Sequence, residues 1–155
     1  MKLLHLSILI VASFCACNGQ SSAPPARVVD DARRDAVITS LNDFFSGKWE
    51  EERIYLEPME LISSDLDRVG NYEAEVVTEK ELQSRYAGKT VAPALARLHV
   101  EAVSTNAESD FRVSISYAGV PVVGAHAIPI GGGKTYWFDL DNGQAKLVRE
   151  VSVEY

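Results

Sequence analysis

From about Ala94 to the end of the chain, apolar and polar residues alternate with a period of two, the pattern of half-buried β-strands. We also expect a strand over Val122 to Ile128, after a turn at Gly119. The connections between these runs are too short for crossover helices, so the pattern predicts an antiparallel sheet. Besides Val122 to Ile128, four stretches show this alternation, and their apolar residues are Leu98, Val100 and Ala102; Phe111, Val113, Ile115 and Tyr117; Tyr136, Phe138 and Leu140; and Leu147, Val151 and Val153.

Glycine-containing turns separate the last of these strands. Asp141-Asn142-Gly143 predicts a hairpin turn, because Asn and Gly tolerate the positive φ angles that two-residue turns require. We interpret Gly131 to Gly133 as a second hairpin turn. Gly133-Lys134-Thr135 matches the end of a phosphate-binding loop, but Ile128 occupies the position where that motif needs glycine, and a strand pattern follows instead of a helix.

Two helices are predicted before the sheet. The first runs from about Asp31 to Ser46 and ends at Gly47; its apolar stripe is Val37, Ile38, Leu41, Phe44 and Phe45. The second runs from about Glu79 to Ala87. Thr78 and Glu81 form its capping box, with Val77 and Leu82 as the hydrophobic staple. Within residues 48–76 we expect only a turn at Gly70-Asn71 and a short helix, with Pro58 in its first turn, that carries Leu61, Ile62 and Leu66.

Helices followed by strands indicate a single α+β domain over residues 28–155, with N-terminal helices packed on one face of a curved antiparallel sheet of four to five strands. The helix Asp31–Ser46 and the closing strand pair TYWFDLDNGQAKLVREVSVEY resemble the cystatin-like group, and in particular NTF2-like domains. This resemblance implies a cone-shaped cavity, from which members of that family run acid–base chemistry on an Asp or a His.

The N-terminus has the composition of an export signal. Lys2 precedes an apolar run, Leu3 to Phe14, which has the length of a signal-peptide core and is too short to span a bilayer. Phe14-Cys15-Ala16-Cys17 resembles the bacterial lipobox, which implies removal of residues 1–16 and lipidation of Cys17. We expect a flexible linker over residues 17–27, since Gly, Ser and Pro dominate it.

The export signal places the mature domain on the periplasmic side of a bacterial cell envelope. Asn18 follows the cysteine, in place of the Asp associated with inner-membrane retention, which favours the outer membrane. An ordinary secretory signal that leaves a soluble secreted protein is the alternative.

The charge of the chain restricts its partners. It has 15 basic and 22 acidic side chains, a net charge of −7, and it would repel nucleic-acid phosphates. We therefore expect no nucleic-acid partner. Cys15 and Cys17 are the only cysteines, so lipidation of Cys17 leaves the mature domain without a disulfide.

No complete catalytic or metal-binding set is evident. His99 and His126 are the only histidines after the signal, and they lie on separate predicted strands, so we expect no metal and no cofactor. Asp139 with His126 or Tyr117 makes a candidate pocket base. Arg149 is in phase with the apolar residues of the last strand; either a bulge turns it outward, or it pairs with an interior carboxylate at a ligand site.

These features leave two functional hypotheses. The first is a non-enzymatic, lipid-anchored envelope lipoprotein that binds another protein as an accessory, inhibitor or immunity factor. The alternative is a small-molecule-binding or weakly catalytic protein with an NTF2-like pocket, and the sequence therefore leaves enzymatic activity undecided.

Overall fold

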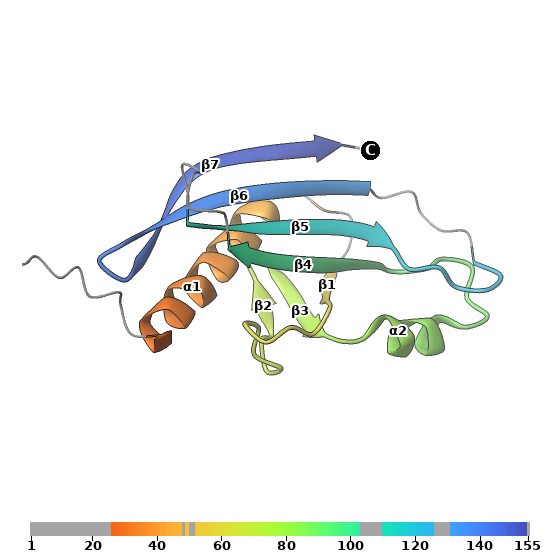
Figure 1. Ribbon diagram of the computed structural model, residues 1–155. Coiled ribbons are helices and arrows are strands. Elements are labelled where there is room, and N and C mark those ends of the chain that lie inside the picture. The colour runs from red at the N-terminus through yellow and green to blue at the C-terminus, as the bar shows by residue number, and fades with distance from the viewer. Residues whose placement is uncertain (1–25, 48, 50–51, 103–109, 126–130, 155) are drawn as a thin grey trace, which may run out of the picture.

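The computed structural model describes residues 26–47, 49, 52–102, 110–125 and 131–154. They form two helices and seven strands in one mixed sheet, so the protein is an α+β protein (Figure 1). The helices are α1 (Ala26–Phe44) and α2 (Glu79–Tyr86). The strands are β1 (Arg53–Leu56), β2 (Arg68–Val69), β3 (Tyr72–Val76), β4 (Ala94–Ala102), β5 (Phe111–Gly119), β6 (Gly131–Asp141) and β7 (Gln144–Glu154).

Strands β4 to β7 form the antiparallel meander that the alternating pattern predicts. Asn142 (φ 51°) and Gly143 (φ 79°) provide the left-handed backbone of the predicted turn between β6 and β7. Register is fixed by the buried face, where Val113 lies opposite Val100 on one side and Tyr136 on the other. The opposite face of these strands carries mainly polar residues, such as Ser114 and Thr135.

Helix α1 packs against the apolar face of the sheet and contacts β2, β5, β6 and β7. Its buried stripe includes Val37 and Leu41, and Phe45 continues this stripe just beyond the last helical residue. These side chains meet the inward-facing side chains Val113, Ile115, Tyr117, Tyr136 and Phe138 in one continuous core. The helix therefore fills the apolar face that β5 and β6 present.

A second, smaller core lies under α2. Leu82 packs there with Val77, Leu95 and Val120, and Leu95 belongs to the face of β4 opposite α1. The predicted capping box is confirmed, since Thr78 Oγ1 accepts from the Glu81 amide at 3.3 Å and Glu81 Oε2 accepts from the Thr78 amide at 2.9 Å. Val77 and Leu82, the predicted staple, are both buried in this core.

Replacement of Thr78 by alanine is expected to destabilise the protein by about 1 kcal/mol, because the Glu81 amide loses its acceptor and the Glu81 carboxylate loses the Thr78 hydroxyl. Urea denaturation followed by circular dichroism measures the loss. Ser84→Ala is the matched control, since Ser84 is exposed within the same helix and has no capping role. Equal stability of Thr78→Ala and the unaltered protein would show that the box contributes nothing.

The expected four to five antiparallel strands are wrong in number and in direction. Three further strands lie within residues 53–76, and β1 pairs in parallel with both β3 and β4. Residues 57–71, which include β2, connect β1 to β3, and a connection of this length permits parallel pairing. The short helix expected after Pro58 is replaced by turns, whereas the turn at Gly70-Asn71 is confirmed and joins β2 to β3.

Three element boundaries also differ from the sequence prediction. Helix α1 begins at Ala26, not near Asp31, so it includes the last two residues of the expected linker. Gly131 to Gly133 belong to β6 and not to a turn; a Cβ on Gly133 would lie 3.1 Å from the Ile115 carbonyl oxygen, so glycine permits close approach of β5. Residues 122–125 form a turn in place of a strand, with Ala125 donating to the Val122 carbonyl.

Candidate functional site

Strand β7 forms one edge of the sheet and pairs only with β6 among the described strands (Figure 1). It is eleven residues long, whereas β2 at the opposite edge has two. An edge strand exposes a row of backbone N–H and C=O groups that can pair with another chain. Four aliphatic side chains on this strand are 43–45% exposed: Leu147, Val148, Val151 and Val153.

A bulge divides β7 into two parts. Trp137 lies opposite Arg149 and Phe138 lies opposite Leu147, so Val148 is the extra residue. As a result Leu147 lies on the face covered by α1, while Val151 and Val153 lie on the opposite, open face. The exposed aliphatic side chains therefore border both faces of the sheet along this edge.

A charged cluster attaches α1 to the strands beside this edge. Lys134 Nζ donates to Asp43 Oδ2 at 2.6 Å and lies 3.0 Å from Glu150 Oε1, while Tyr136 Oη donates to the same Asp43 oxygen at 2.8 Å. The hydrogen bond from Lys134 lowers the pKa of Asp43 below its ordinary value. Burial, followed by the bond to Asp43, raises the pKa of Tyr136. The cluster thus joins the C-terminal end of α1 to β6 and β7.

This cluster predicts a dependence of stability on pH. Because the pKa of Asp43 is lowered on folding, its contribution to stability is present above the ordinary value of 3.8 and is lost as the pH falls through the lowered value. Asp43→Asn keeps the shape of the side chain but removes its charge. We expect the difference in free energy of unfolding between the unaltered protein and Asp43→Asn to shrink towards zero on acidification.

Urea midpoints measured between about pH 7 and about pH 2 give this difference. Asp35→Asn is the control, because Asp35 is an exposed carboxylate on the same helix. A difference for Asp43→Asn that stays constant over the whole range would contradict the assignment.

The open face beside β7 carries a cation–π pair. The guanidinium carbon of Arg149 lies 4.1 Å from the centroid of the Trp137 ring. Trp137 on β6 and Arg149 on β7 lie on the same face of the sheet as Val151 and Val153. On this face, Val151 and Val153 are therefore bordered by an aromatic ring with a cationic side chain stacked on it.

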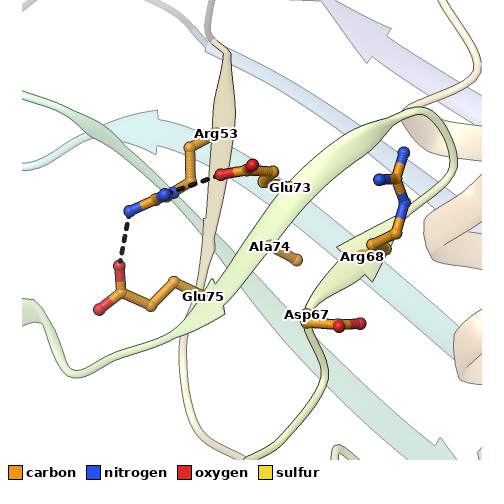
Figure 2. A pocket seen from close by; sticks show the side chains of 6 residues that line it. All are labelled: Arg53, Asp67, Arg68, Glu73, Ala74 and Glu75. Atoms are coloured by element: carbon orange, nitrogen blue, oxygen red, sulfur yellow. Dashed lines mark hydrogen bonds and ion pairs between the residues drawn. The ribbon is translucent and has the colours of Figure 1, made fainter.

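A depression of about 390 Å³ lies among β1, β2 and β3 (Figure 2). Arg53 reaches Glu73 at 2.7 Å and Glu75 at 3.6 Å, and Arg85 bonds the other oxygen of Glu75. Arg68 lies opposite Glu73 and donates to the Asn71 carbonyl. These charges balance one another at the surface, so the depression is best described as an exposed ion-pair network.

Another depression, of about 340 Å³, is lined by Tyr55, Tyr86, Val91 and Pro93, with Arg53 and Glu52 among its other residues. The two phenol oxygens are 3.0 Å apart and the rings meet nearly at right angles. Burial and then the bond to Tyr86 raise the pKa of Tyr55 to about 12, so it stays protonated at neutral pH. The lining is mainly apolar, with one hydroxyl pair inside it.

The residues proposed from the sequence as a pocket occupy different places. Tyr117 is 1% exposed, lies on the α1 face, and its ring packs against Phe45 and Trp49. Asp139 lies on the open face opposite Lys146, and Arg149 lies on the same face opposite Trp137. The structure thus puts Asp139 and Arg149 on one face of the sheet and Tyr117 on the other. His126 and the lipidation candidate Cys17 lie outside the described residues.

The sequence reasoning missed both the exposed edge and the charged cluster. The hairpin turn at Asn142-Gly143 pairs the last predicted strand with the one before it, so the place of β7 beside β6 could have been inferred, but not its open outer side. Asp43 and Lys134 are separated by 91 residues, and no local pattern links them.

Comparisons with known proteins give no family. No protein-family model, curated protein or solved structure matches this chain. In the part of the chain that the structure describes, no helix is long and apolar enough to cross a membrane, and no three His, Cys, Asp or Glu side chains are grouped as metal ligands.

Proposed function

We propose that this chain is a non-enzymatic lipoprotein of the bacterial envelope, anchored through Cys17, and that its domain binds protein by accepting an extended strand along β7. The single observation that carries the binding role is the eleven-residue edge strand with four half-exposed aliphatic side chains. The anchor rests on the lipobox-like sequence Phe14 to Cys17.

Strand addition suits this edge better than docking on one face of the sheet. A partner placed on the open face would cover Val151 and Val153 but leave Leu147, which lies on the α1 face. A strand added beside β7 would pair its backbone groups and contact the aliphatic side chains on both faces. This mode explains the exposure on both faces with one contact.

The test is position-specific crosslinking in cells that make the full-length protein. A photoreactive amino acid at position 153 should give a defined covalent adduct with a polypeptide, and Val151→Lys should abolish it, since a lysine there opposes burial at the edge. The matched control is the same amino acid at position 123, where Val123 is 95% exposed in a turn outside β7. Adducts of equal yield at positions 123 and 153 would refute the edge as the binding site.

A second candidate function is supported by the Tyr55–Tyr86 depression, whose volume falls within the range of small-molecule sites. In this proposal the domain is a cystatin-like or NTF2-like protein that holds a compact, mainly apolar ligand with one polar group directed at the phenol pair. Thermal-shift screening of such compounds tests it, with Tyr86→Phe as the variant that removes one hydroxyl. Stabilisation of both proteins to the same extent by every active compound would contradict the use of this site.

A further inference from the structure

We propose that the strand which occupies the β7 edge is β7 of a second copy, in an antiparallel, two-fold arrangement with Val151 opposite Val151 at the axis. This inference rests on the proposed function, because it uses the same edge. It adds the identity of the occupant and its register.

The two parts of β7 differ in how they are protected from pairing. The first part carries Lys146 and the Val148 bulge, two devices that prevent edge-to-edge association. The second part, residues 149–154, is a regular strand opposite residues 132–137 of β6, without proline or lysine. Only this second part is therefore suited to a regular ladder with another chain.

Symmetry restricts how two such strands can pair. Residues directly opposite in an antiparallel pair point to the same face, and a two-fold axis places equivalent patches against each other. Arg149, Val151 and Val153 share the open face, and Glu150 and Ser152 share the α1 face. The axis must then pass through a residue position and not between two neighbouring positions.

Charge selects among the possible centres. An axis at Glu150 places two glutamates opposite each other, and an axis at Arg149 places two arginines opposite each other. An axis at Ser152 places position 150 of each copy opposite position 154 of the other, and both positions are glutamates. An axis at Val153 pairs only residues 152–154 of β7, which ends at Glu154. An axis at Val151 places Arg149 opposite Val153 and Glu150 opposite Ser152, with no like charges opposed.

The Val151-centred register also covers Val151 and Val153, the exposed aliphatic side chains of the second part of β7. Val151 and Val153 of both copies meet on the open face, and the Arg149–Trp137 pair of each copy borders them. The sheets of the two copies become one continuous sheet. Because each chain has a net charge of −7, the copies repel one another, and added salt should strengthen the pairing that the backbone and the valines provide.

Cysteine crosslinking with a short bismaleimide, in envelope membranes that carry the full-length protein, tests this register. Val151→Cys should give a crosslinked dimer alone. Arg149→Cys and Val153→Cys should give none alone, because residue 149 is about 13 Å from its own equivalent in this register, but should give the dimer when co-expressed. Val123→Cys and the protein without an introduced cysteine are the controls.

We expect at least about tenfold more dimer from Val151→Cys than from Val123→Cys, since directly opposed side chains are only about 5 Å apart. Equal yields at positions 123, 149, 151 and 153 would indicate random collision and overturn the inference. Adducts at β7 that contain only a different polypeptide would also overturn it, while the proposed binding function would stand. A dimer with the predicted pattern, and no other polypeptide crosslinked at this edge, would support a second copy as the occupant of the β7 edge.

Discussion

Replacing Phe45 with alanine is expected to cost about 3–5 kcal/mol of folding free energy, the largest loss we expect from a single truncation in this protein. Phe45 is fully buried, and its ring contacts Tyr117 edge-on at 5.4 Å and Trp49 at 5.3 Å. Its amide also donates to the Leu41 carbonyl, so it continues α1 by one hydrogen bond. The alanine variant therefore leaves a cavity where the helix, β5 and the segment after α1 meet.

Urea denaturation and thermal melting measure this loss, and a decrease in melting temperature on the order of 10 °C is expected for a domain of this size. Phe44→Ala is the matched control, because Phe44 is the preceding residue but only partly buried, and it should cost clearly less. Equal losses for the two variants would mean that the ring cluster after α1 does not hold the helix on the sheet.

The part of the fold that local patterns specify was predictable from the sequence. Alternation determined β4 to β7, and the capping box with Val77 and Leu82 determined α2, because the interactions behind these signals join residues near each other in the chain. The same applies to the turn at Asn142-Gly143, whose conformation depends on those two residues.

The rest of the fold depends on contacts between distant segments. Strands β1 and β2 are only four and two residues long, too short for a period to be recognised, and β1 is stabilised by parallel pairing with β3 and β4. The in-phase position of Arg149 made a bulge one of two explanations, but no local signal located it at Val148, so the expected common face of Leu147 and Val151 was wrong. For the candidate site, the sequence identified Leu147, Val151 and Val153 only as the apolar face of the last strand, and the structure was needed to show that they are half exposed along an edge.

Cys17→Ser is expected to abolish membrane attachment entirely, the largest functional effect that the proposal predicts. Several acyl chains on one cysteine give stable anchoring, and the proposal gives the domain no other attachment to the membrane. Without the acyl chains, the acidic chain would have no attraction to anionic lipid headgroups. Labelling with radioactive palmitate and fractionation of the cells measure the two consequences, loss of label and loss of membrane association.

Cys15→Ser is the matched control, since it changes the other cysteine of the same segment, keeps Ala16 before Cys17 and should retain full labelling. The pair separates lipidation from a general effect of removing a thiol. Labelling of Cys17→Ser at the level of the unaltered protein would refute Cys17 as the anchor, whereas an unaltered protein without label would leave the secreted form as the explanation of the N-terminus. Either result would leave the proposed binding role of β7 unchanged, because β7 is more than a hundred residues from Cys17 in the sequence and its role is tested separately by crosslinking.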